Sequence, residues 1–197
     1  MALRKTLALL EYGARVTVIS PRICEGIKDL LEKSRISVLL REMDAFDIEH
    51  AALVVAATDD REVNRKVSWV CAENKTLVNV VDDIEESDFI FPSTVKRGDF
   101  TIAVSTSGHF PTLARKVREE LEESYGEQYG SLVAVLGTIR QKAVQEIQDA
   151  SLRNKIFEKL AECGWSGEAR NMSSRELERY LSAIYEVWKN EHNKDRK

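Results

Sequence analysis

Two adjacent aspartates, Asp82 and Asp83, follow directly after the apolar run from Thr76 to Val81. We expect that run to be a buried strand, and in open α/β sheets the carboxyl ends of the strands face the ligand crevice. A carboxylate at such an edge can act as general base when a carbon pair is oxidised by loss of a hydride and a proton. Asp82 is therefore the candidate catalytic residue, with a cap or turn as its alternative role, whereas Asp83 is expected to be the turn residue.

Polar side chains also stand at the ends of two other expected strands, where a dinucleotide cofactor would bind. Ser20 and Pro21 end the first of these strands, at the place where classical NAD enzymes carry an acidic residue that hydrogen-bonds the ribose. That acid is missing here. Ser20 and Pro21 therefore either contact the ribose or form a plain strand-to-helix junction. Arg22 could accept a 2′-phosphate, so NADP remains an alternative cofactor.

Thr58 follows the second strand together with Asp59, Asp60 and Asn64. These short polar residues are candidates for contacting the nicotinamide half of the cofactor, for capping the next helix, or for both, with Thr58 and Asn64 as the candidate cofactor contacts.

A polar loop precedes the helix that we expect to begin at Pro111. A helix N-terminus carries a partial positive charge, which favours the binding of carboxylates. Arg115, one turn into that helix, can pair bidentately with a carboxylate. The loop is therefore a candidate substrate site, with an ordinary capped loop as the alternative. Its residues are Ser105, Thr106, Ser107 and Gly108.

Metal ligands and disulfides are not indicated by the sequence. His109 is the only histidine in a candidate site, and a single histidine without a second ligand is weak support for a metal. The cysteines, Cys24, Cys71 and Cys163, are odd in number, far apart and without a CxxC pair, which points away from a zinc site and toward a reducing compartment. We therefore expect no bound metal and a cytoplasmic protein.

The overall composition restricts the class of partner. The 197 residues carry a net charge of −4, which disfavours a general binder of the nucleic-acid backbone. The longest apolar run, Ala51 to Ala57, is far shorter than the roughly 20 residues that span a bilayer, and no signal-peptide pattern begins the chain. We expect neither a nucleic acid nor a membrane as partner.

The order of apolar patterns predicts how these residues are positioned. Up to about residue 83, short apolar strands alternate with amphipathic helices, which predicts an α/β fold with a parallel, Rossmann-like sheet covered on both faces. The helices are expected at 3–11, 21–32 and 61–73, and the strands at 15–20, 37–40, 52–57 and 76–81.

From residue 84 onward the pattern changes. Strands at 89–93 and 100–106 are expected to pair antiparallel, and Pro111 suits the first turn of a helix that follows them. The rest of the chain is helical in pattern. We expect three parts, namely a Rossmann-like domain (1–83), a small antiparallel and helical dimerisation module (84–124) and a helical C-terminal segment (125–197).

Several ordered segments together give the chain a family resemblance. They are Ala2-Leu3-Arg4-Lys5, Gly13 to Pro21, Val54 to Asn64, Asn79 to Asp83, Phe89 to Ser93, Ala103 to Gly108 and Pro111 to Arg115. Each segment alone is a weak signal, but their order and spacing are specific. The chain resembles the precorrin-2 dehydrogenase and siroheme synthase N-terminal family over essentially its whole length.

The resemblance implies an NAD-dependent enzyme that oxidises precorrin-2 to sirohydrochlorin in siroheme biosynthesis, with iron insertion as a second activity in some members. It implies that Asp82 is the catalytic aspartate, that Ser20 and Pro21 lie at the adenosine ribose, and that the loop before Pro111 binds the tetrapyrrole. It also implies a homodimer held by the central module. A non-catalytic, nucleotide-sensing module is the alternative from a different class.

One expected feature of a dinucleotide site is not found in the sequence. A first strand and a glycine-rich turn that holds the pyrophosphate normally precede a helix such as 3–11. Here Met1 to Lys5 lead directly through that helix to the strand at 15–20. A late start, a trimmed sequence and natural loss of the strand are the explanations left open. On this pattern we expect the chain to bind NAD weakly or not at all.

Overall fold

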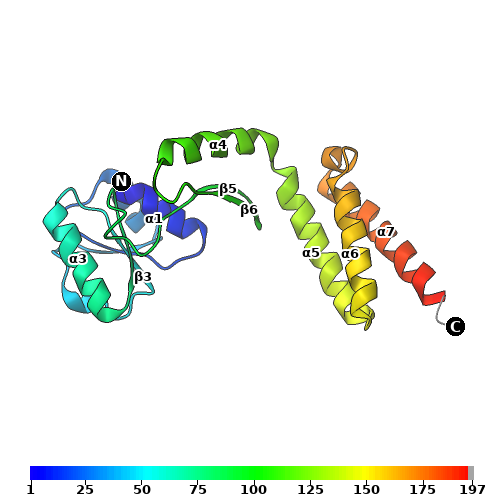
Figure 1. Cartoon of the computed structure of the whole chain (residues 1–197), viewed down its shortest axis with the longest axis horizontal. Helices are drawn as coiled ribbons and strands as arrows, with labels where there is room; N and C mark the ends of the chain where they lie inside the picture. Colours follow the sequence, from blue (N-terminus) through cyan, green and yellow to red (C-terminus); the bar gives the residue numbers. More distant parts are fainter. Residues whose placement is uncertain (195–197) are drawn as a thin grey trace. The chain divides into compact units, whose positions relative to one another are not determined.

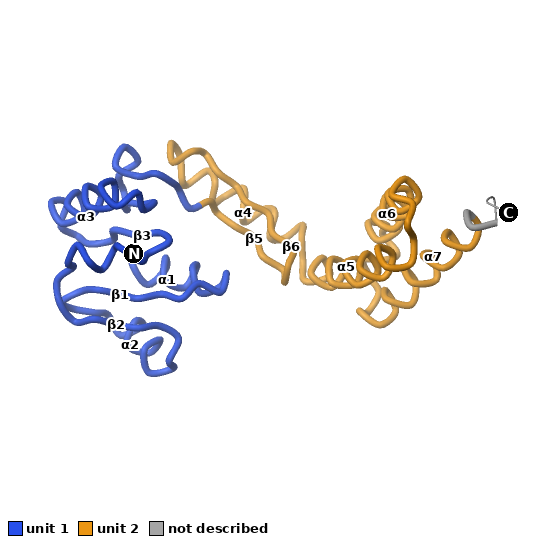
Figure 2. Tube along the Cα trace, turned by 90° about the horizontal axis from the view of Figure 1, so that it is seen from below, with its two compact units in different colours: residues 1–91 blue, residues 92–197 orange. Residues whose placement is uncertain are grey.

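The computed structural model describes residues 1–194 (Figure 1). The chain divides into two compact units, which Figure 2 shows in different colours. Unit 1 comprises residues 1–91, and unit 2 begins at Pro92. Each unit is described by itself below.

Unit 1 is an alternation of short strands and helices, as the apolar pattern predicts. Each observed strand lies inside the range expected for it and is slightly shorter. The elements are α1 (Ala2–Glu11), β1 (Thr17–Ile19), α2 (Glu25–Glu32), β2 (Ser37–Leu39), the 3-10 helix η1 (Ala45–Asp47), β3 (Leu53–Ala56), α3 (Arg61–Asn74) and β4 (Leu77–Val80).

The four strands of unit 1 form two parallel pairs, which corrects the expectation of one continuous sheet. β1 pairs with β2, and β3 pairs with β4 over four residues on each strand. Within residues 1–194, no sheet pairing joins β1 to β3. In the doubly wound order 3-2-1-4-5-6 the first strand lies between the second and the fourth. The β1–β2 pair corresponds to the strands on one side of that first strand, and the β3–β4 pair to the strands on its other side. No strand of the described residues occupies the position between β1 and β3, so these two edges have no sheet partner among the described residues.

Each strand pair has its own small core. Val67, Val70 and Cys71 of α3 pack against Val78 and Val80 of β4. Around the other pair, α2 and β2 build a cluster on Ile27, Leu30 and Ile36 with partly buried side chains of α1 and β1. Because alternate residues of a strand face opposite sides, Asn79 of β4 points away from the face that α3 covers.

Helix α2 begins later than the sequence pattern predicts. Its first residue is Glu25 rather than Pro21. The Ser20 hydroxyl donates to the Arg22 carbonyl oxygen at 2.6 Å and accepts from the Arg22 amide at 3.4 Å, which closes a local turn. Such side-chain bonds to nearby backbone compete with helix formation, so the helix starts after the turn.

Unit 2 begins with an antiparallel hairpin whose first strand is shifted from the expected position. The strands are β5 (Ser93–Arg97) and β6 (Phe100–Val104), and Gly98 makes the turn with φ +59°. The expected strand at 89–93 is wrong, because the residues before Pro92 bond to β4 instead. The Asp88 amide donates to the Val78 carbonyl at 2.8 Å, and Pro92 has no N–H to offer a ladder.

The helical character of the remaining chain is confirmed. The helices are α4 (Pro111–Ser124), α5 (Gln128–Glu146), α6 (Ala150–Trp165), the 3-10 helix η2 (Ala169–Asn171) and α7 (Ser174–Lys194). Helices α5, α6 and α7 lie beside one another (Figure 1) and bury Ile156, Leu181 and Tyr185 almost completely. The start of α7 is a capping box, in which the Ser173 amide donates to Glu176 at 2.9 Å.

Candidate active site

The two aspartates that follow β4 have different environments. Asp83 is built into the turn, since its side chain accepts from the Glu86 amide at 3.2 Å and its carbonyl accepts from the Ser87 hydroxyl at 2.6 Å. Asp82 is exposed and has a left-handed backbone, with φ +63°. Within residues 1–194 no hydrogen bond to the Asp82 carboxylate is found. The carboxylate of Asp82 is therefore free to meet a ligand, whereas that of Asp83 is occupied.

The backbone conformation of Asp82 is itself informative. Left-handed φ values are uncommon for residues other than glycine, and they cluster at functional sites where the surrounding structure holds them. Here the Val81 amide donates to the Ala56 carbonyl at 2.9 Å, and the Ser87 hydroxyl bonds both backbone groups of Val80. The end of β4 is thus fixed on both sides, which directs Asp82 away from the strand.

Thr58 and Asn64 are brought together at the end of β3. The Asn64 side chain accepts from the Thr58 hydroxyl at 2.8 Å and from its amide at 3.2 Å, and donates to the Thr58 carbonyl at 3.0 Å. Asn64 is buried, while Thr58 is exposed. The helix cap is Asp60, which accepts from the amides of Glu62 and Val63. Asn64 therefore fixes the loop, and Thr58 is the member of the pair that solvent reaches.

Ser20 and Pro21 lie at the carboxyl end of β1. The Ser20 amide donates to the Leu39 carbonyl at 3.1 Å, which extends the pairing with β2 by one residue. The Ser20 hydroxyl is engaged by Arg22, as described above, and Pro21 and Arg22 are exposed. A ribose contact by the Ser20 hydroxyl would thus have to share or replace its bond to the Arg22 carbonyl.

The polar loop before α4 belongs to unit 2. The Ser107 amide donates to the Ser105 hydroxyl at 3.1 Å, and the Phe110 amide donates to the Thr106 hydroxyl at 3.2 Å. Ser107 and Gly108 both have left-handed backbones, with φ +51° and +78°. This geometry leaves exposed hydroxyl groups beside the positive end of a 14-residue helix, which suits an anionic ligand.

Arg115 lies on the exposed side of α4. Its guanidinium is 4.0 Å from the Glu119 carboxylate, and both side chains are more than half exposed, so the pair contributes little to stability. Arg118, one turn of chain further, is less exposed and pairs with Glu119 and Glu122. Arg115 is therefore the more readily available of the two for a ligand carboxylate.

Helix α1 offers a site for the phosphates of a dinucleotide. Its N-cap, Met1, gives the first-turn amides no side-chain cap, and the first turn contains no acidic residue. The first-turn amides and the basic side chains of Arg4 and Lys5 gather positive charge at this helix end. These groups fit a pyrophosphate, and the polar strand ends at Thr58 and Ser20 fit the rest of a dinucleotide.

Two family models match consecutive parts of the chain. Residues 1–93 match a model described as putative NAD(P)-binding, and residues 97–124 match one described as sirohaem biosynthesis protein central. The siroheme synthase of Thioalkalivibrio sulfidiphilus is 41% identical over 162 residues, which cover 82% of this chain and 33% of the relative. That of Mannheimia succiniciproducens is 34% identical over 94% of this chain and 40% of the relative.

The chain belongs to the siroheme synthase N-terminal and precorrin-2 dehydrogenase family. The family resemblance noted in the sequence is thereby confirmed, and unit 1 is its NAD(P)-binding domain. The chain spans about a third of the length of the first siroheme synthase compared. A solved structure titled SirC, precorrin-2 dehydrogenase, has the same fold, with a TM-score of 0.74 at 23% identity over 92% of this chain and 89% of that one.

Sequence reasoning did not single out Lys5, which contacts an aromatic ring near the end of unit 1. Lys5 of α1 is half buried, and its ammonium lies 4.0 Å from the centre of the Phe91 ring. Burial and the charge of Arg4 lower the pKa of Lys5, and the charge of Asp82 raises it. The segment Ala2 to Lys5 contributed to the resemblance, but only the fold brings Lys5 close to residues so distant in sequence.

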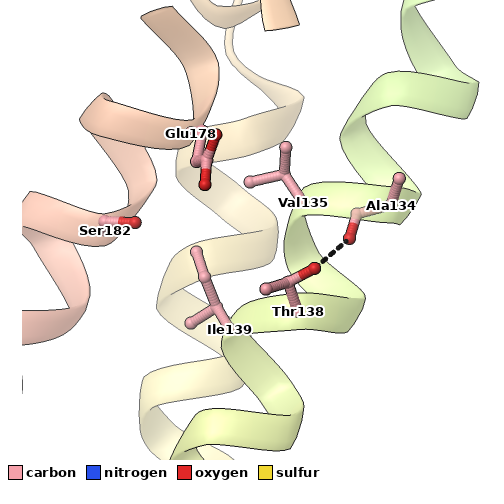
Figure 3. A pocket seen from close by; sticks show the side chains of 6 residues that line it. All are labelled: Ala134, Val135, Thr138, Ile139, Glu178 and Ser182. Carbon is pink, nitrogen blue, oxygen red and sulfur yellow. Dashed lines mark hydrogen bonds between the residues drawn. The ribbon is translucent and has the colours of Figure 1, made fainter. Parts of the chain in front are cut away.

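A hollow lies in unit 2, between α5 and α7. Figure 3 shows Thr138 of α5 and Glu178 and Ser182 of α7 along its wall. The Thr138 hydroxyl donates to the Ala134 carbonyl at 3.1 Å and is therefore occupied. No residue with a role predicted from the sequence lines this hollow, so it is not a candidate for the family's chemistry.

Other classes of site find little support in the described residues. Among residues 1–194 no group of three or more histidine, cysteine or acidic side chains is arranged to hold a metal ion, and no helix is long and apolar enough to cross a membrane. Cys24, Cys71 and Cys163 are all unpaired thiols. Burial raises the pKa of the Cys71 thiol to about 11, which makes it a poor nucleophile.

Proposed function

We propose that this chain catalyses the NAD-dependent dehydrogenation of precorrin-2 to sirohydrochlorin, a step of siroheme biosynthesis, in the cytoplasm. The observation that carries the proposal is the exposed carboxylate of Asp82 at the carboxyl end of β4, in the NAD(P)-binding domain of this family. The names of the siroheme synthase relatives and of the matched precorrin-2 dehydrogenase support it.

Asp82 takes the proton in this proposal. Dehydrogenation of a carbon pair breaks two C–H bonds, one with loss of a hydride and the other with loss of a proton, and a C=C bond forms. When bound, NAD⁺ supplies the acceptor for the hydride. The Asp82 carboxylate accepts the proton, because it is exposed and unengaged by hydrogen bonds in the described part of the chain.

The cofactor contacts follow the ends of the parallel strands. Ser20 and Pro21 after β1 are proposed to contact the adenosine ribose, and Thr58 with Asn64 after β3 the nicotinamide half. Thr58 makes the direct contact, and Asn64 holds it in place. NAD is the expected cofactor, and exposed Arg22 is the residue that would accept the 2′-phosphate of NADP.

The substrate contacts come from unit 2. Precorrin-2 carries several carboxylates, and the loop before α4 combines hydroxyl groups with a positive helix end. Arg115, exposed one turn into α4, is proposed to pair with one of these carboxylates. The proposed contacts in the loop are Ser105, Thr106, Ser107 and Gly108.

The proposal also assigns a role to each part of the chain. Residues 1–83 bind the cofactor, 84–124 bind substrate and form a homodimer, and 125–197 form a helical segment. The β5–β6 hairpin supports dimerisation, because a two-stranded sheet is marginally stable alone and gains from a partner strand or surface.

Turnover of precorrin-2 tests the proposal directly. Purified protein is incubated with precorrin-2 and either NAD⁺ or NADP⁺, and sirohydrochlorin and reduced nucleotide are measured together. We expect both products in equal amounts, with NAD⁺ preferred. Nucleotide binding without either product would favour the alternative of a nucleotide-sensing module. Adding ferrous iron to the same reaction reports any iron insertion separately.

A further inference from the structure

Phe110 occupies a position of α4 that does not suit a phenylalanine. It is the N-cap of the helix, and its side chain makes no capping hydrogen bond. Serine, threonine, asparagine and aspartate are preferred there, because their side chains bond the free amides of the first turn. A helix without such a cap is less stable, and departures of this kind from local rules are expected at functional sites. The aromatic ring therefore needs a reason other than helix stability.

The backbone of Phe110 is fixed on both sides. Its amide donates to the Thr106 hydroxyl at 3.2 Å, and its carbonyl accepts from the Leu113 amide at 3.0 Å. Pro111 further disfavours the helical conformation for the residue before it. The side chain of Phe110 is nevertheless 61% exposed. A ring on a fixed backbone loses less conformational freedom when it binds a partner, which favours affinity.

Leu113 continues the apolar surface by one turn of α4. It is 49% exposed, whereas Ala114 beside it is buried, in a helix that packs against the β5–β6 hairpin (Figure 1). Residues three apart along a helix are neighbours, so Leu113 lies on the side of α4 toward Phe110. Single exposed apolar residues are ordinary, but these two form a joint apolar surface next to the polar loop.

Lys116 adds a positive charge on the same side of α4. It is exposed and stands three residues after Leu113, so the two side chains are neighbours. No ion pair of Lys116 is found within residues 1–194. Arg115, by contrast, is two residues after Leu113, faces another side of the helix and lies beside Glu119. The surface therefore combines an apolar area with an available cation at its border.

We propose that Phe110 and Leu113 form an apolar platform for one face of the tetrapyrrole substrate, and that Lys116 binds a carboxylate at the edge of the same macrocycle. The inference rests on the proposed function for the identity of the substrate. Aromatic rings stack on flat unsaturated ring systems, and an ammonium group pairs with carboxylates. Precorrin-2 offers both, a face of linked rings and several carboxylates around it. Arg115, on another side of α4, is left for a different carboxylate.

Charge favours the substrate over a second copy of the chain as the occupant of this surface. The first turn of α4 contains no acidic residue, and its amides carry the positive end of the helix dipole. In a two-fold dimer centred on this surface, the surface would meet itself and bring two Lys116 ammonium groups together. Like charges opposed in this way are unfavourable, whereas the carboxylates of the substrate complement them.

Binding of sirohydrochlorin tests the platform without turnover. The compound is titrated into the wild-type chain and its variants, and its change in absorbance gives Kd. We expect Phe110→Ala to raise Kd at least about tenfold, because the stacked ring is lost, and Phe110→Trp to stay near wild type. Phe46→Ala, an exposed phenylalanine of η1, is the matched control and should leave Kd unchanged. An unchanged Kd in Phe110→Ala would overturn the inference.

The salt dependence of the same Kd tests Lys116. Lys116→Met is expected to weaken binding at low salt by about threefold to tenfold and to make Kd less sensitive to salt, because salt screens the pair that the variant lacks. Lys116→Arg keeps the charge and should keep both properties. Lys155→Met, an exposed lysine of α6, is the matched control. The same Kd for Lys116→Met and wild type at low salt would contradict the role of Lys116.

Kinetics and oligomeric state distinguish the platform from a structural role. In Phe110→Ala we expect a higher KM for precorrin-2 with kcat nearly unchanged, since the platform binds substrate and transition state alike. A lower kcat with an unchanged KM would contradict this. Sedimentation should give the same oligomeric state for Phe110→Ala as for wild type. A change of oligomeric state would mean that this surface joins two copies of the chain, and would overturn the inference.

The experiments separate the inference from the proposed function. If the wild-type chain does not oxidise precorrin-2 but binds sirohydrochlorin in a way that depends on Phe110, the proposed function fails and the platform stands. If turnover is normal and Phe110→Ala changes neither KM nor Kd, the proposed function stands and the inference fails.

Discussion

Polar groups in the C-terminal helices are bonded to one another, whereas the exposed carboxylate at the end of β4 in unit 1 is not bonded in this way within the described residues. In the helices, the hydroxyl of fully buried Tyr185 bonds Glu146 at 2.8 Å, and Lys189 bridges Glu146 and Glu186. Burial and the Glu146 carboxylate raise the pKa of Tyr185 to about 12, so it stays neutral. At the end of β4, Asp82 has no such partner within residues 1–194.

This difference separates a region built for stability from one built for binding. In the helices, the charged groups of that network are paired with one another and lie beside buried aliphatic residues. Few of these polar atoms remain to bind a ligand. Unit 1 has two small cores, sheet edges without partners among the described residues, and polar strand ends. The account therefore predicts large stability effects in the helices and effects on binding or catalysis in unit 1.

Truncation of Leu181 is expected to give the largest stability effect. Leu181 of α7 is 0% exposed, and Leu181→Ala leaves a cavity that costs about 2–5 kcal/mol of unfolding free energy. Val187→Ala on the same helix is the control, because Val187 is 53% exposed and should change little. Urea unfolding followed by circular dichroism measures both. Similar losses in the two variants would argue against a tightly packed helical core.

In unit 1, substitution of buried Asn64 is expected to lower the unfolding free energy substantially. Asn64→Ala removes the buried amide that bonds three groups of Thr58, at a cost of about 1–3 kcal/mol. Asn74→Ala, at the exposed end of the same helix, loses one bond and should cost less. Nucleotide affinity is measured alongside stability. Unchanged stability in Asn64→Ala would refute its role in holding the loop.

The edges of β1 and β3 that have no sheet partner within residues 1–194 can be tested by supplying a strand. A strand and glycine-rich turn fused ahead of Ala2 should pair with both edges, add backbone donors for a pyrophosphate, and raise NAD affinity at least about tenfold, or 1.4 kcal/mol. A fusion of equal length with prolines at alternate positions cannot pair and serves as control. Calorimetric titration and thermal melting measure the two effects. Equal NAD affinity in both fusions would mean that the pyrophosphate is held elsewhere.

The smallest expected effect concerns acid stability in unit 1. Hydrogen bonds from Arg41 at 2.6 and 2.7 Å lower the pKa of Asp47 from 3.8 to about 2. A depressed pKa contributes stability above the unfolded value, so this contribution is complete above about pH 4 and is lost as the pH falls through about 2. Because Arg41 is nearly half exposed, we expect less than about 1 kcal/mol.

Asp47→Asn isolates that contribution. The variant should differ from wild type in unfolding free energy above about pH 4, and the difference should shrink as the pH falls toward about 2. Glu49→Gln, an exposed neighbour, is the matched control. A difference that is the same at every pH would show that the ion pair is not its cause.

The elements of unit 1 were largely predictable, because β-branched strands and amphipathic helices depend on local sequence. Pro111 likewise marked a helix start that the structure confirms. The start of α2 and the position of β5 were not predictable in this way. The start of α2 depends on the bond from the Ser20 hydroxyl to the Arg22 carbonyl, which competes with helix formation. The position of β5 depends on the bond from the Asp88 amide to the Val78 carbonyl, which ties the preceding residues to β4.

The candidate site was predictable only in part. The position after the strand made Asp82 the candidate base and Asp83 the expected turn residue. The bonds that occupy Asp83, from the Glu86 amide and the Ser87 hydroxyl, follow only from the folded turn. The contact of Lys5 with Phe91 joins residues from opposite ends of unit 1, and no local pattern encodes such a contact.

The central claim is that Asp82, and not its neighbour Asp83, removes the substrate proton. The most direct measurement compares the rates of sirohydrochlorin formation by the wild type, Asp82→Asn and Asp83→Asn, with folding checked by circular dichroism. We predict a loss of about 10²–10⁴-fold in Asp82→Asn, as for removal of a general base, and a far smaller change in Asp83→Asn. Undiminished turnover by a folded Asp82→Asn chain would contradict the account.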